Sequence, residues 1–149
     1  MKDITRRQAL AIGGSAIFVA AMGIKPVQAA NDSQDLIKEF TSGKAATEGK
    51  INLDLPEIAE NGNTVPMSLT VDSSMTKDNY VKRVIVVADG NPRGAVATFH
   101  FSPASGVAEA STRMRLAKTQ NIIAVAEMSD GSFYTASKQV KVTVGGCGG

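Results

Sequence analysis

Residue types that commonly build functional sites are scarce in this chain of 149 residues, which has no tryptophan, one cysteine and one histidine. A single cysteine excludes a disulfide within the chain, so apolar burial must hold the fold together. A single histidine, His100, offers too few ligands for a multi-histidine metal site and no convincing Ser-His-Asp triad. Aromatic residues make up only 5% of the chain, and no basic stripe accompanies them, which disfavours a nucleic-acid partner.

The N-terminus has the features of an export signal. The paired arginines Arg6 and Arg7 precede a modest apolar stretch, 12–24, and small residues before a cleavage point at Ala29 follow. We therefore predict a twin-arginine signal peptide over 1–29 and a periplasmic protein. The alternative is a membrane anchor, but the stretch is short of the roughly 20 apolar residues that a span needs. We expect no membrane attachment after cleavage, when the net charge of +2 falls to about −1.

Residues 30–144 have the pattern of one domain, with a short helix followed by strands. Over 31–43, Leu36, Ile37 and Phe40 recur at helical spacing, and Gly43 ends the run. The runs that follow alternate apolar and polar residues with period two, as strands with one buried face do. These runs lie at 51–55, 65–71, 95–101, 108–116 and 139–144.

Two further runs, 84–88 and 122–126, are almost continuously apolar, which is typical of central strands buried on both faces. Turn-forming residues separate the runs at 60–63, 89–92, 102–106 and 129–132. Eight short strands with such turns predict an all-β fold, an immunoglobulin-like β-sandwich. Pro66 lies inside its run, which indicates an edge strand or a bulge.

The only cysteine, Cys147, lies in the C-terminal sequence Gly145-Gly146-Cys147-Gly148-Gly149. Glycine allows thin, mobile backbone, so we expect 145–149 to form a flexible arm that carries a reactive thiol. A rigid catalytic site is not expected on such an arm. Three alternatives stay open: a frayed terminus with an incidental cysteine, a structural or adhesive sandwich joined to another chain by a Cys147 disulfide, and a metal-handling module that uses Cys147 and His100.

Arg113 and Arg115 share one face of a predicted strand. Two arginines on one face suit an anion such as a sulfur oxyanion, although a solvated strand face explains them more simply. The glycine-rich segment 90–94 lies between strands without a following helix, so we interpret it as a turn and not as a phosphate-binding loop.

The tail pentapeptide, the export signal and the predicted sandwich together resemble the SoxY family of the periplasmic sulfur-oxidising Sox system. Three internal segments are also similar to that family. They are Leu55-Pro56-Glu57-Ile58-Ala59-Glu60-Asn61-Gly62 with Val65-Pro66, Val96-Ala97-Thr98-Phe99-His100-Phe101, and Thr112-Arg113-Met114-Arg115-Leu116-Ala117-Lys118-Thr119-Gln120. The resemblance covers nearly the whole chain, and the tail is its most specific motif.

The resemblance implies a carrier that is not an enzyme, has no cofactor or metal of its own, and forms a stable heterodimer with SoxZ. It implies that Cys147 is the covalent attachment point for thiosulfate-derived intermediates. The haem-containing SoxAX would join thiosulfate to the cysteine as an S-thiosulfonate. SoxB would then release sulfate, and a sulfane dehydrogenase would act on the remaining sulfur. Gly145, Gly146, Gly148 and Gly149 would form the carrier arm.

Overall fold

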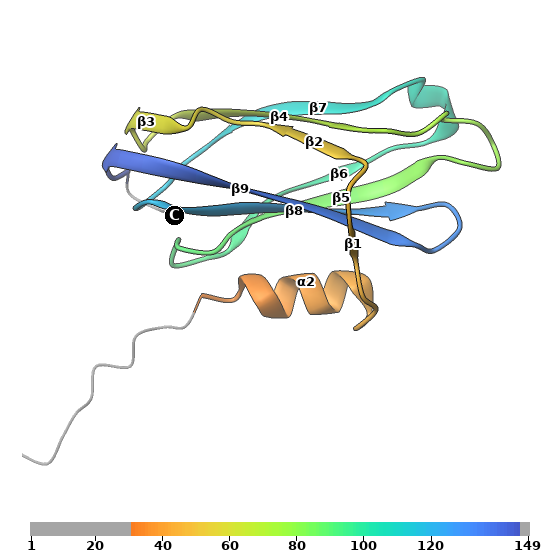
Figure 1. The fold of residues 1–149 in the computed structure, drawn as a ribbon, viewed down its shortest axis with the longest axis horizontal. Coiled ribbons are helices and arrows are strands. Elements are labelled where there is room, and N and C mark those ends of the chain that lie inside the picture. The colour runs from red at the N-terminus through yellow and green to blue at the C-terminus, as the bar shows by residue number, and fades with distance from the viewer. Residues whose placement is uncertain (1–30, 147–149) are drawn as a thin grey trace, which may run out of the picture.

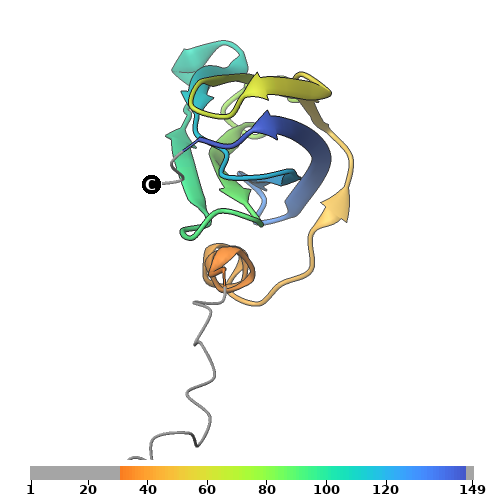
Figure 2. The ribbon, with the colours of Figure 1, turned by 90° about the vertical axis from the view of Figure 1, so that its left-hand side faces the viewer.

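The computed structural model describes residues 31–146, which form three layers (Figures 1 and 2). A sheet of three strands packs on a larger sheet, and the single helix of these residues covers the opposite face of that larger sheet. The predicted sandwich with a short N-terminal helix is therefore confirmed. The export segment 1–29, with Arg6 and Arg7, lies outside the described residues.

The described residues contain helix α2 (Ser33–Thr41), the short 3-10 helix η2 (Pro103–Ser105) and nine strands. The strands are β1 (Thr47–Glu48), β2 (Ile51–Asp54), β3 (Ile58–Asn61), β4 (Val65–Val71), β5 (Val81–Ala88), β6 (Ala95–His100), β7 (Ala108–Met114), β8 (Gln120–Met128) and β9 (Phe133–Val144). This is one strand more than the sequence predicts. β1 and β3 escape the prediction because segments this short show almost no alternation.

The larger sheet has the order β1-β9-β8-β5-β6. β8 and β9 form the predicted antiparallel hairpin around 129–132. β9 is long enough to receive two parallel neighbours on its other edge. Thr47 of β1 pairs with Tyr134 near its start, and Asn61 of β3 pairs with Val144 at its end. The last residues of β9, which lead into the tail, are therefore held by β3.

The smaller sheet has the order β2-β4-β7, so β4 is a central strand and the prediction of an edge strand at Pro66 is wrong. Locally, however, the proline is tolerated for the expected reason. β2 pairs only with Ser68–Val71 of β4, so no strand lies beside Pro66 on that side. A residue without an N–H leaves no ladder hydrogen bond unmade there.

Apolar side chains from the facing sides of the two sheets form the main core. The smaller sheet contributes Leu69 and Met114, and the larger sheet contributes Val84, Val86 and Ile122, all of them almost completely buried. Burying such a side chain stabilises a fold by about 1.5–3 kcal/mol. This core replaces the inter-sheet disulfide of antibody domains, as the cysteine count predicts.

Helix α2 explains why the runs at 84–88 and 122–126 are apolar on both faces. Its Phe40 packs with Ile85, Val87 and Val125 in a second core, and Leu36 and Ile37 flank this cluster. The helix ends at Ser42 and Gly43, both with positive φ, and their amides donate to the carbonyls of Glu39 and Lys38. The predicted helical face and stop are thus confirmed. No helix within 31–146 has the length and apolar character that crossing a bilayer requires.

An ion-pair cluster ties α2 to the larger sheet. Glu127 accepts hydrogen bonds from Arg83 Nε at 2.5 Å and Lys82 Nζ at 3.0 Å, and the Arg83 guanidinium lies 4.3 Å from the Phe40 ring centroid. Burial alone would raise the pKa of Glu127. The hydrogen bonds and charges of Arg83 and Lys82 outweigh it, so this pKa lies below its ordinary value.

Candidate functional site at the root of the tail

The chain reaches its tail along the last residues of β9, which extend past the end of β8. Val140 is fully buried, and the Val142 amide donates to Thr119 Oγ1 at 2.9 Å. Beside it, Ala59 of β3 pairs with Val142 and is buried. Two strand contacts and one side-chain hydrogen bond thus fix the direction in which the chain leaves the sandwich.

A relay of backbone hydrogen bonds continues this attachment beyond β9. The Gly62 amide donates to the Val144 carbonyl at 2.8 Å, and the Leu116 amide donates to the Gly62 carbonyl at 2.8 Å. The Gly146 amide in turn donates to the Leu116 carbonyl at 2.9 Å. The relay joins the turn after β3, the loop after β7 and the tail. The tail is therefore fastened to the domain as far as Gly146.

Three glycines make this close approach possible, and we call Gly62, Gly145 and Gly146 the glycine clamp. A Cβ added to Gly146 would lie 2.6 Å from the carbonyl carbon and oxygen of Gly62. A Cβ on Gly62 would overlap the Leu116 carbonyl oxygen, and one on Gly145 would overlap that of Ala117. None of the three has a positive φ. Glycine is therefore required at these positions for space and not for an unusual backbone angle.

These contacts correct one part of the sequence prediction. Gly145 and Gly146 were expected to belong to a mobile arm, but both are packed against the domain in the structure. The same property of glycine, its missing side chain, underlies both behaviours. The other predicted site residues, Cys147, Gly148 and Gly149, lie outside the described residues.

A buried amide network supports the loop to which the tail is fastened. The Asn91 side chain donates to the Arg115 carbonyl at 2.8 Å and accepts from the Ala117 amide at 3.0 Å. Gln120 Nε2 also donates to Asn91 Oδ1, at 2.8 Å. Asn91 and Gln120 are both buried. Buried amides without partners are costly, so this network holds the 115–120 loop in one conformation.

His100 does not belong to this arrangement. It is exposed, and it pairs with Arg83 at the end of β6, whereas Asn91 precedes the start of that strand. Five residues of extended strand, about 17 Å, separate His100 from Ala95. Within 31–146, no three His, Cys, Asp or Glu side chains gather as metal ligands would. The tail root therefore recruits backbone groups and amides, with no imidazole among them.

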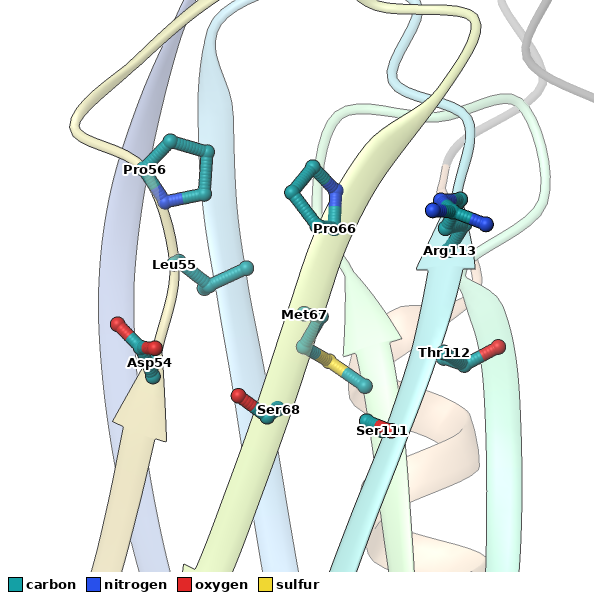
Figure 3. Close-up of a pocket in the computed structure, with 9 residues that line it drawn as sticks. All are labelled: Asp54, Leu55, Pro56, Pro66, Met67, Ser68, Ser111, Thr112 and Arg113. Carbon is teal, nitrogen blue, oxygen red and sulfur yellow. The ribbon is translucent and has the colours of Figure 1, made fainter.

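The largest pocket, of about 780 Å³, lies on the outer face of the smaller sheet (Figure 3). Ser68 and Ser111 are register partners on its floor, and Asp54 and Arg113 lie on the two flanking strands. Neither serine has a histidine beside it among the pocket residues, so no activated nucleophile is assembled there. The remaining lining residues are Leu55, Pro56, Pro66, Met67 and Thr112.

Comparison with known proteins identifies the family. The model of the family described as "Sulfur oxidation protein SoxY" matches residues 37–147. The chain belongs to the SoxY family. One similar solved structure is the sulfur carrier protein SoxY from Chlorobium limicola f thiosulfatophilum, with 31% identity, a TM-score of 0.61, and coverage of 74% of this chain and 96% of the other. No curated protein sequence gives a match.

The sandwich itself is shared more widely than the SoxY family. A superoxide reductase (neelaredoxin) from Ignicoccus hospitalis has 14% identity and a TM-score of 0.57, with coverage of 63% of this chain and 80% of the other. A superoxide reductase from Nanoarchaeum equitans has 11% identity and a TM-score of 0.55, with coverage of 64% and 99%. At such low identity these similarities show the fold alone.

Sequence reasoning missed several residues at the tail root. Gly62 was interpreted only as part of a turn, and Asn91 as part of a glycine-rich loop. The resemblance to the SoxY family did include Gly62, Leu116 and Ala117, which was the one signal available. No local pattern indicates that residues 62, 116 and 146 meet, because their contacts are long-range.

Proposed function

We propose that this protein is a covalent carrier of thiosulfate-derived sulfur intermediates, attached to Cys147. The observation that carries the proposal is the family match, which extends to residue 147 and therefore includes the only cysteine of the chain. The similar Chlorobium structure is described as a sulfur carrier protein. A unique thiol next to a fastened glycine pair suits a group that is presented to other proteins.

The chemistry requires a partner that accepts electrons. Joining the Cys147 sulfur to the sulfane sulfur of thiosulfate forms an S–S bond and releases one proton and two electrons. The thiolate is the reactive form of the cysteine. Hydrolysis of the terminal sulfonate then consumes one water, releases sulfate, and leaves a persulfide on the cysteine. Neither step uses a group of the sandwich, so the carrier itself performs no catalysis.

The partners and the location follow from the same proposal. A stable complex with SoxZ would hold the carrier, and SoxAX, SoxB and a sulfane dehydrogenase would visit Cys147 in turn. These encounters would be transient, with interfaces below about 1,200 Å². The work would take place in the periplasm after export by the twin-arginine signal over 1–29, with Arg6 and Arg7 as its recognition residues.

Intact-mass measurement of the protein from thiosulfate-grown cells tests the proposal. We expect sulfur adducts on the wild type and on His100→Ala, and none on Cys147→Ser. Thiosulfate oxidation should be lost only in Cys147→Ser, with the fold retained. A fully active Cys147→Ser variant would overturn the proposal, as would a wild type isolated only as a Cys147-linked dimer. Loss of activity in His100→Ala together with a bound metal would favour the metal-handling alternative.

A further inference from the structure

A second pocket, of about 440 Å³, opens between the start of β6 and the end of β7. Both strands are outer strands of their sheets in the described residues. The pocket is lined by Asn91, Arg93, Ala95, Val96, Arg113, Met114 and Arg115. Three of its seven lining residues are thus arginines, brought together from two segments about 20 residues apart in the sequence.

The arginines of this pocket have no acidic partner in the described part of the chain. Both ion pairs within 31–146 involve Glu127, at the opposite end of β8 from Gln120. No carboxylate lines the pocket. The nearby Asp32 accepts a hydrogen bond from the Gly94 amide at 2.6 Å. Arginine forks match the oxygens of tetrahedral oxyanions, so the pocket has the charge and the donors for such a group.

The pocket lies directly beside the tail root. Asn91 lines the pocket, and its side chain binds Arg115 and Ala117 on either side of Leu116. Leu116 accepts the hydrogen bond from the Gly146 amide. Cys147 follows Gly146 in the sequence, and consecutive Cα atoms are 3.8 Å apart. A group carried on that cysteine therefore starts next to the pocket.

We propose that Arg93, Arg113 and Arg115 bind the terminal sulfonate of an anionic sulfur intermediate carried on Cys147. The inference rests on the proposed function. The loaded tail then has a docked position on its own domain, with the sulfonate in the pocket and the tail root fixed by the glycine clamp. Removal of the sulfonate as sulfate leaves a persulfide that lacks the oxyanion, and this releases the tail.

Chemical loading of the mature protein tests the inference independently of any enzyme. Tetrathionate converts the Cys147 thiolate into the S-thiosulfonate and releases thiosulfate, and iodoacetamide gives a neutral adduct of the same cysteine. In nitrogen-15 spectra, we expect the Nε–H signals of the three arginines to shift with the thiosulfonate and not with the neutral adduct. Free sulfate, added as a competing oxyanion, should reverse these shifts.

Protection of the adduct provides a second measurement. We expect reductive removal of the thiosulfonate to be at least about fivefold faster in Arg113→Gln/Arg115→Gln than in the wild type, the change that a docking energy of about 1 kcal/mol produces. Lys77→Gln, which removes an exposed positive charge elsewhere, should match the wild type.

The inference is overturned if the arginine signals do not respond, if both adducts shift them equally, or if the arginine variant and the wild type lose the adduct at the same rate. Because loading is chemical, these outcomes report on the pocket alone. The proposed function fails separately, if cells do not load Cys147.

Discussion

Substituting Gly62 by alanine tests the glycine clamp without altering a single residue of the tail. The new Cβ would overlap the Leu116 carbonyl oxygen and would lie 2.7 Å from the Gly146 nitrogen. Both atoms are backbone, so the loop or the tail has to move. The hydrogen bonds from Gly62 to Val144, from Leu116 to Gly62 and from Gly146 to Leu116 share this point and would weaken together.

The expected loss of stability is moderate because the clamp lies at one end of the sandwich. Adding a methyl group to a tightly packed site costs about 1–3 kcal/mol. A cost of about 2 kcal/mol lowers the melting temperature of a domain of this size by roughly 8 °C. Exchange of the Gly146 amide with solvent should be at least about tenfold faster, since about 1.4 kcal/mol is a factor of ten.

The assay combines thermal unfolding with amide hydrogen exchange, and Asn63→Ala is the matched control. Asn63 is exposed in the same turn, and only its backbone amide takes part in the hydrogen bonds found there. The control should unfold and exchange like the wild type. If Gly62→Ala leaves both the melting temperature and the Gly146 exchange rate unchanged, the clamp does not hold the tail and our reasoning about this site is wrong.

The same variant separates two roles of the tail glycines. Bulky residues at Gly145 and Gly146 would both stiffen the arm and break the clamp, so they cannot distinguish slimness from anchorage. Gly62→Ala breaks the clamp and leaves the arm slim. If anchorage matters, enzymatic loading of Cys147 should slow by about tenfold, because ordering one further residue at each encounter costs about 1–2 kcal/mol. Unchanged loading would show that only slimness is needed.

Two further predictions concern the rest of the domain. Because the folded state lowers the pKa of Glu127, its charge stabilises the fold above the ordinary value of 4.5, and this contribution is lost as pH falls through the lowered pKa. The melting temperatures of wild type and Glu127→Gln should therefore differ at pH 7 and converge in acid; a constant difference would contradict this. Asn91→Ala should lower the free energy of unfolding in urea by about 1–3 kcal/mol, because Gln120 and the 115–117 backbone lose buried partners. An unchanged urea midpoint, with Asn63→Ala as reference, would refute the network.

Much of the fold could be predicted because its signals are local. Alternation located most strands, since residues two apart share a sheet face whatever the topology. The apolar runs at 84–88 and 122–126 correctly indicated strands covered on both faces. They did not reveal which element covers the second face, and the structure shows that it is helix α2. Turn residues located the β8–β9 hairpin. The position of Pro66 in a central strand was missed because strand order depends on pairing partners that local sequence does not name.

The sequence alone determined the family, the unique thiol and the glycines around it, because residue types and their order carry the chemistry. Tertiary structure alone decided that Gly62 meets the tail, that Gly145 and Gly146 are packed against backbone, and that Arg93 joins Arg113 and Arg115 around one pocket. These contacts join segments far apart in the chain, and closing such loops depends on the packing of the whole sandwich, which no local pattern records.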